Sequence, residues 1–246
     1  MTDFLPGLAT GKILEALTRA PGNEVKSGKI DSPESSAALV ANAFGWFLAR
    51  PADLPPLPGG LGAAHSVTLE AEMRFPWAGG KHPWLDVAIE TDHYLIGIES
   101  KRYEPFRPAK NNDFAASYDR PVWGENMQGY DRLRRTFAGG AHRFAVLDMV
   151  QLVKHAYGLR TEAQRREKRP VLIYLYAEPA NWASGKVVDP LRLAQHRKDI
   201  ELFARSVESD EVSFAAMTWA ELLTLWSGNP ACAPHAARVL ERFGPL

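Results

Sequence analysis

The stretch that decides the fold is HPWLDVAIETDHYLIGIESKRYEPF, residues 82–106. Two runs, 84–91 and 94–103, read as strands, because each has an apolar centre: Leu85, Val87 and Ile89 in the first, and Leu95, Ile96 and Ile98 in the second. Only Asp92 and His93 separate the runs, so we expect an antiparallel hairpin. The sequence therefore predicts two paired strands near the centre of a sheet.

The register of this hairpin places three charged side chains together. With a two-residue turn at Asp92-His93, Asp86 faces Glu99, and directly opposed residues lie close across a strand pair. Glu99 and Lys101 are two residues apart, so they share one side of their strand. A slip of one residue would move the two acids to opposite faces. The turn therefore decides whether a cluster of charges forms.

This cluster has two interpretations. A cross-strand salt bridge of Lys101 with Asp86 or Glu99 would satisfy charges at the end of an apolar strand, because a bare buried charge is costly. Alternatively, the two carboxylates share a divalent cation, for which hard oxygen ligands are suited. Spacing alone leaves both interpretations open.

The rest of the chain alternates helical and extended patterns. Helices are expected near 10–20, 32–49, 125–137, 142–157 and 189–207, with two more at the C-terminal end, and further strands at 66–75, 171–177 and 212–217. We expect Ser32 to cap the second helix, Glu34 to lie in its first turn, and Gly158 to end the helix from 142. The fold class expected is α/β, with a mixed central β-sheet flanked by helices in one domain, 1–246.

Composition excludes several classes of protein. Hydrophobic residues make up 46% of the chain, yet no apolar run approaches the length of a membrane span. One cysteine, Cys232, excludes an internal disulfide, and with no signal-peptide pattern we expect a cytoplasmic protein and no membrane partner. The formal net charge is zero, but 101–169 holds 15 Lys and Arg against 8 Asp and Glu. This basic segment follows the hairpin, where a nucleic acid backbone would need neutralising.

Residues 82–106 resemble the PD-(D/E)XK nuclease superfamily. The resemblance is carried by Asp86, twelve intervening residues and Glu99-Ser100-Lys101, with Pro83-Trp84-Leu85 before them. The segments SPESSAALVANAFGWF and KRYEPF also resemble restriction-endonuclease-like members. The order of elements agrees over about 32–177, with 32–49 as the first core helix, 66–103 as three strands, 125–137 as the second core helix and 171–177 as a further strand. Leu85 stands where the superfamily has proline before the first acid.

The resemblance implies a metal-dependent nuclease that hydrolyses phosphodiester bonds in DNA, in restriction or repair. It implies a core at about 32–177 with a C-terminal α/β elaboration at 178–246, and Mg²⁺ (or Mn²⁺) as cofactor. Asp86 and Glu99 would be metal ligands and Lys101 would position the attacking water. Glu34 would be the additional acid, with Glu70 and Glu72 as rivals.

Other expectations concern the substrate. Gln128 and Arg132, on the helix expected at 125–137, would touch the phosphate backbone, although both fit an ordinary surface. The oligomeric state stays open, and a dimer is compatible with such an enzyme. The alternative function is a catalytically inactive nuclease-fold domain that binds nucleic acid or protein.

Overall fold

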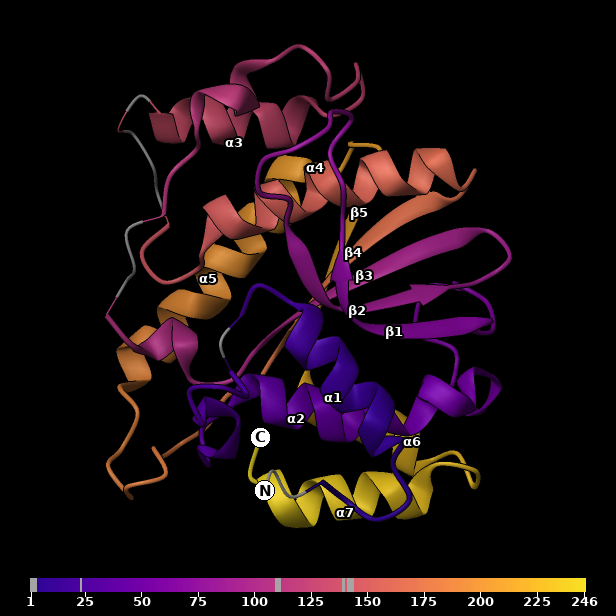
Figure 1. The fold of residues 1–246 in the computed structure, drawn as a ribbon. Coiled ribbons are helices and arrows are strands. Elements are labelled where there is room, and N and C mark those ends of the chain that lie inside the picture. The colour runs from indigo at the N-terminus through magenta and orange to yellow at the C-terminus, as the bar shows by residue number, and fades with distance from the viewer. Residues whose placement is uncertain (1–3, 23, 109–111, 139, 141–143) are drawn as a thin grey trace.

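The sheet has five strands in the order in which they occur along the chain (Figure 1). The structure, a computed structural model, describes residues 4–22, 24–108, 112–138, 140 and 144–246. The strands are β1 (Ser66–Glu72), β2 (Trp84–Glu90), β3 (Tyr94–Lys101), β4 (Arg169–Tyr176) and β5 (Ser213–Thr218). The first three are antiparallel neighbours, whereas β4 and β5 run parallel to β3. The prediction of a mixed sheet is confirmed.

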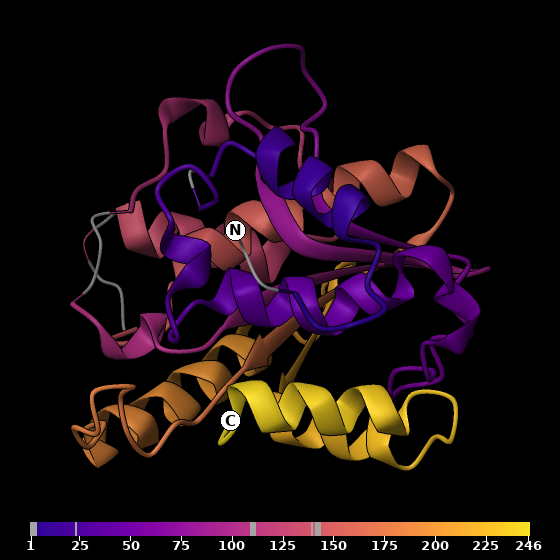
Figure 2. The same ribbon diagram turned by 60° about the horizontal axis from the view of Figure 1, so that its bottom comes forward.

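Helices cover both faces of the sheet (Figure 1). One face carries α1 (Thr10–Arg19), α2 (Ser36–Phe44), α6 (Trp219–Ser227) and α7 (Ala233–Phe243), whose buried residues form one hydrophobic cluster with the sheet. The other face carries α3 (Gln128–Ala138), α4 (Met149–Arg165) and α5 (Pro190–Val207), in a second cluster. Seen from below, α7 lies across the face that α2 covers (Figure 2). The expected α/β class is thus confirmed as a restriction-endonuclease-like core.

The C-terminal segment is joined to the core through Arg102, the residue that follows β3. Its buried guanidinium donates to the carbonyls of Pro33 and Phe243, one before α2 and one at the end of α7. The residue directly after the motif strand therefore links the segments before α2 and at the end of α7.

The second helix begins later than predicted. Ser35, not Ser32, is the N-cap of α2, and its hydroxyl accepts a hydrogen bond from the Ala38 amide at 3.1 Å. Ser32 follows a short 3-10 turn, and its Oγ accepts the Glu34 amide at 3.3 Å. Both serine hydroxyls can cap a helix, but the Ser32 hydroxyl is engaged in a local turn before the helix. Glu34 consequently precedes the helix and is not part of its first turn.

The helix predicted over 142–157 is also shifted. His142 lies outside the described residues, α4 begins at Met149, and Gly158 lies inside the helix. A Cβ at Gly158 would stand 2.7 Å from the Met73 carbonyl oxygen and 2.8 Å from Pro83 Cγ. The glycine therefore serves the close approach of α4 to the β1–β2 connection, and its prediction as a helix end is wrong.

This packing predicts opposite effects for two helical glycines. Gly158→Ala is expected to lower the free energy of unfolding by about 1–3 kcal/mol, because backbone must move to admit the methyl group. Gly11→Ala in α1 is the matched control: a Cβ there meets nothing within 4 Å. It should raise the free energy of unfolding by about 0.5–1 kcal/mol through helix propensity. Urea unfolding measures both, and a Gly158→Ala protein as stable as the Gly11→Ala protein would contradict the packing.

Candidate active site

The hairpin has the predicted register. Val87 pairs with Ile98 and Glu90 pairs with Leu95, which makes Asp86 and Glu99 the next opposed positions. The Thr91 amide donates to the Tyr94 carbonyl at 3.0 Å and closes the turn over Asp92-His93. The register predicted from this turn is confirmed as far as the pair Val87–Ile98.

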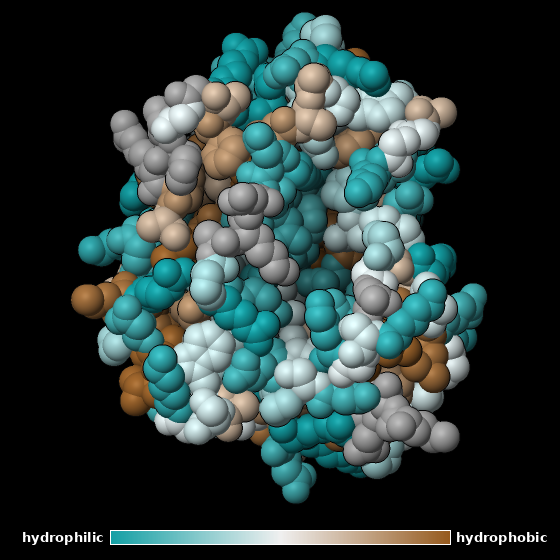
Figure 3. Space-filling model, turned by 60° about the vertical axis from the view of Figure 1, so that its left-hand side comes forward, coloured by the Kyte–Doolittle hydropathy of each residue, from teal (hydrophilic) through white to brown (hydrophobic). Residues whose placement is uncertain are grey.

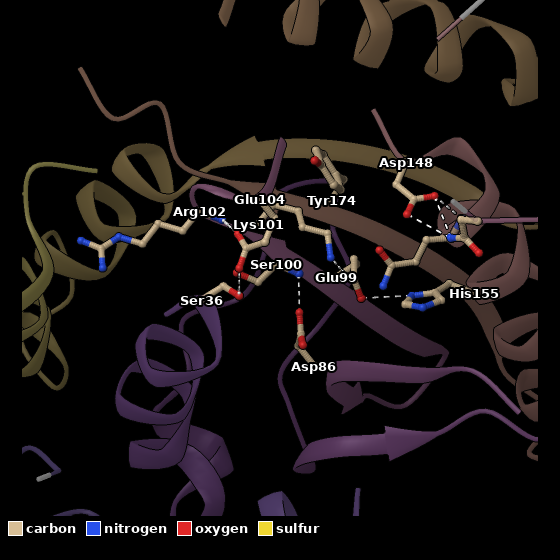
Figure 4. Close-up of polar contacts among 12 residues, drawn as sticks. Ser36, Asp86, Glu99, Ser100, Lys101, Arg102, Glu104, Asp148, His155 and Tyr174 are labelled. Carbon is tan, nitrogen blue, oxygen red and sulfur yellow. Dashed lines mark hydrogen bonds and ion pairs between the residues drawn. The ribbon is translucent and has the colours of Figure 1, made fainter. Parts of the chain in front are cut away.

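The strands β2 and β3 stop pairing at Asp86. Beyond Val87–Ile98 the ladder ends, although β3 stays paired with β4 as far as Lys101 and Tyr176. The amide of Ser100 donates instead to Asp86 Oδ2 at 2.6 Å (Figure 4). A side chain thus satisfies the backbone donor that the separating strand leaves free. The carboxylate of Asp86 is held where the two strands diverge.

Glu99 is buried between a cation and a histidine (Figure 4). Lys101 Nζ donates to Glu99 Oε1, and His155 Nδ1 lies 3.2 Å from Glu99 Oε2. The side chains of Glu99 and Lys101 are 3% and 17% exposed. The salt bridge considered as an alternative therefore exists between neighbours on one strand.

Burial and crowding shift the pKa values of this group. Burial, and then the charge of Glu99, raise the pKa of Asp86 well above its usual value. Burial also raises the pKa of Glu99, against the opposing effect of Lys101. For Lys101, burial disfavours the ammonium, but Glu99, Asp86 and Glu104 together raise its pKa. The single positive charge of Lys101 is therefore shared by three carboxyl groups, those of Glu99, Asp86 and Glu104.

His155 is uncharged at this site. Burial and then the charge of Lys101 lower its pKa to about 3. The neutral ring contacts Glu99 from α4, on the side of Glu99 away from Lys101 (Figure 4). His155 was missed by sequence reasoning because no second histidine at ligand spacing marks it.

Glu70 is the third acid that the fold places at this site. In the β1–β2 register it stands opposite Asp86, between the pairs Leu69–Val87 and Ala71–Leu85. Burial, then the charges of Asp86 and Glu99, raise its pKa to about 8. Its φ of 49° is in the left-handed region, which is uncommon for a non-glycine residue.

Glu34 has other partners. Arg107 Nη2 lies 2.7 Å from Glu34 Oε2, and the Ala183 amide donates to Oε1 at 3.1 Å. The expected first-turn position is wrong, so the helix does not aim this carboxylate toward Asp86. Glu72, the other candidate for the additional acid, has its Oε2 3.8 Å from Arg74 Nε.

The first turn of α2 instead contributes Ser36. Its hydroxyl donates to Glu104 Oε1 at 2.6 Å, and the Arg102 amide donates to Glu104 Oε2 at 2.8 Å (Figure 4). Burial opposes ionisation of Glu104, but Lys101 and these hydrogen bonds together lower its pKa. Glu104 is therefore an ionised neighbour of Lys101 that sequence reasoning missed.

Gln128 and Arg132 lie away from this group. Both are exposed on α3. This helix packs on α4 and α5, whereas α4 packs on β3 and β4 of the sheet. Gln128 lines a separate cavity of about 370 Å³ with Asp131 and Arg134. The element that follows the motif and packs on β3 and β4 is α4, so the predicted place of 125–137 as the core helix is wrong.

A larger cavity of about 690 Å³ opens beside Lys101 and Glu104. The start of α4 lines it through Asp148, Gln151 and Lys154. The face at the end of β3 and β4 is hollowed near its middle, with hydrophilic residues around much of the hollow (Figure 3). The sequence indicates where α4 begins, because an aspartate is a common helix N-cap. The Asp148 side chain does cap α4, since it accepts a hydrogen bond from the Gln151 amide.

The donor chemistry fits a hard cation, although the site is not a complete cage. Asp86 and Glu99 supply carboxylate oxygens, and Mg²⁺ is usually held by one or two carboxylates together with water and phosphate. Within the described residues, no three or more His, Cys, Asp and Glu side chains already form a group that could hold a metal ion. Lys101 occupies one oxygen of Glu99 here.

Across the described part of the chain, no helix combines the length and apolar character needed to cross a bilayer.

Comparison with known proteins assigns the family. No curated protein and no solved structure matches the chain. A family model does match, and it spans residues 15–243, which include every strand of the sheet and the whole candidate site. The chain therefore belongs to the REase-ARP family, described as "Restriction Endonuclease associating with ARP".

Proposed function

We propose that this protein is a Mg²⁺-dependent nuclease of the PD-(D/E)XK type that hydrolyses phosphodiester bonds in DNA during restriction or repair. The convergence of Asp86, Glu99 and Lys101 where β2 and β3 separate carries the proposal. Membership of a restriction endonuclease family supports this class of reaction. Mn²⁺, with the same preference for oxygen ligands, would replace Mg²⁺.

Asp86 and Glu99 would hold the cation, with Glu70 in place of Glu34 as the additional acid. After burial, the charge of Asp86 contributes to the raised pKa of Glu70, and the charge of Glu99 contributes to the raised pKa of Asp86. A cation among these acids would relieve that repulsion. When bound, the ion would lower the pKa of a water molecule and stabilise charge on the phosphate. The Ser100 amide holds Asp86 by a hydrogen bond, and the neutral His155 ring packs against Glu99.

Lys101 would act as a cation and not as a general base. The carboxylates around it raise its pKa, so it keeps its proton at neutral pH. An ammonium here can position the attacking water through a hydrogen bond and offset charge on the pentavalent phosphate. Its bond to Glu99, a proposed ligand, would keep it beside the cation.

The alternative, a catalytically inactive nuclease-fold domain that binds nucleic acid or protein, rests on two observations. Lys101 is already paired with Glu99, and the described acidic side chains do not form a group ready for a metal ion. Binding of nucleic acid without metal, unaffected by Asp86→Asn, would favour this alternative.

The nuclease proposal predicts metal-dependent cleavage. Supercoiled plasmid and circular single-stranded DNA should be cut by the purified protein with Mg²⁺ or Mn²⁺, and EDTA should stop the reaction. Lys101→Ala and Asp86→Asn should each lower the rate by at least about 100-fold, because each removes charge stabilisation or a ligand at the reacting phosphate. Gel analysis of the DNA forms measures the rates.

The control for this experiment is Arg205→Ala, an exposed change near the end of α5 that lies outside the candidate site. Its cleavage rate should stay within a few-fold of the unchanged protein. Circular dichroism melts should show that all variants are folded. A Lys101→Ala protein that is folded and fully active would contradict the assignment.

A second prediction separates Glu70 from Glu34. Glu70→Gln should weaken Mn²⁺ binding by about tenfold or more, since a carboxylate next to Asp86 is lost. Glu34→Gln changes the charge equally but breaks only the contacts with Arg107 and Ala183, so affinity should change little. Isothermal titration calorimetry with Mn²⁺ measures both. Loss of affinity in the Glu34 variant alone would restore Glu34 as the third acid.

A further inference from the structure

The cavity of about 690 Å³ extends from the candidate site into the space beside α4. Lys101 and Glu104 line it where β3 ends, and residues 144–151 line it where the chain enters α4. Its volume is typical of cavities that hold small organic molecules, about 300–1,000 Å³. Neither the proposed cation nor Lys101 needs so large a space.

The lining of the cavity contains the three kinds of groups that a nucleotide requires. Cations are supplied from three elements and one loop, flat apolar surface comes from aromatic side chains, and hydrogen-bonding groups come from two amides and a carboxylate. The cations are Lys101, Arg107, Lys154 and Arg192, the aromatic residues are Phe137, Phe144 and Tyr174, and the polar residues include Asn112, Asp148 and Gln151. Proteins that take a base out of its stack bind its edge by hydrogen bonds and its faces by such apolar side chains.

The polar part of this lining is already ordered. Asn112 Nδ2 donates to both oxygens of Asp148 at 3.1 and 3.0 Å, and Lys154 Nζ donates to Asn112 Oδ1 at 2.9 Å. Asp148 is at the same time the N-cap of α4. These three side chains are therefore held in place by one another.

Gln151 differs from these three neighbours. In the described parts of the chain, its side-chain amide has no hydrogen-bond partner, although it lines the cavity next to the Asp148 network. An amide in this position offers both a donor and an acceptor to the edge of a base.

We infer that the cavity beside Lys101 receives one nucleotide of the DNA strand, with its phosphate near Lys101 and its base against Phe144 and Gln151. The inference rests on the proposed function, since it takes the nuclease substrate as the source of the nucleotide. A nucleotide at a strand end and an internal nucleotide turned out of its stack have this chemistry in common.

The test measures binding of deoxynucleoside 5′-monophosphates by calorimetry, with deoxyribose 5-phosphate as the ligand that lacks a base. At least one of dAMP, dCMP, dGMP and dTMP should bind tenfold or more tightly than deoxyribose 5-phosphate. Ala145→Trp, which fills the cavity from an exposed lining position, should abolish this preference. The matched Ala231→Trp, exposed between α6 and α7, should keep it.

Gln151→Ala provides a second variant that leaves the fold's hydrogen bonds intact among the described residues. It should weaken the tightest monophosphate by fivefold or more without changing deoxyribose 5-phosphate binding. Competition with linear and circular single-stranded DNA of one sequence separates the sources. Displacement by the circle supports an internal nucleotide, and displacement by the linear strand alone supports a strand end.

Equal affinity for deoxyribose 5-phosphate and all four monophosphates would overturn the inference, as would unchanged binding in both cavity variants or displacement by neither DNA. Because none of these measurements needs cleavage, they stay informative if Mg²⁺-dependent hydrolysis is absent. Cleavage lost with nucleotide binding intact would instead count against the proposed function.

Discussion

The separation of β3 from β2 at Asp86 is the constraint on which the candidate site depends. A strand that leaves its partner exposes backbone donors, and these must find other acceptors. Here the Ser100 amide bonds to the Asp86 carboxylate while β4 continues to hold β3 through Lys101. The end of β3 therefore stays hydrogen-bonded to β4 where it leaves β2, and Asp86 lies at the point where β2 and β3 separate.

The site concentrates charge that the rest of the fold does not neutralise. Burying a charge costs several kcal/mol unless partners compensate it, and here one ammonium, Lys101, serves the acids around it. Glu70 adds backbone strain, since a left-handed non-glycine residue costs about 1–2 kcal/mol. The acids are crowded and Glu70 is strained at the same point. A bound cation would offset the free-energy cost of the crowded acids, and a phosphate would bind beside it.

The sequence predicted those parts of the site that depend on strand periodicity and a short turn. Alternation placed Glu99 and Lys101 on one side of β3, and the turn at Asp92-His93 set Asp86 opposite Glu99. It named Glu70 only as a rival of Glu34, because along β1 that residue lies on the polar side of an alternating pattern. Only the pairing with β2 puts it opposite Asp86.

The helices were harder to place than the strands. Ser32 and Ser35 have the same capping chemistry, and the choice between them depends on a turn that residue type does not specify. Gly158 reads locally as a helix end, but its role is to admit Met73 and Pro83 from distant parts of the chain. The identity of the core helix, α4 instead of α3, likewise follows from packing on β3 and β4. These are tertiary effects that local patterns do not contain.

The most direct measurement is the position of Mn²⁺ in crystals of the protein soaked in that ion, located by its anomalous scattering. A cation bound at the opening between β2 and β3, at about 2.1 Å from carboxylate oxygens of both Asp86 and Glu99, is the result expected. Strong Mn²⁺ sites elsewhere, with Lys101 still paired to Glu99 and no ion between the two acids, would contradict a metal-dependent nuclease centred on this hairpin.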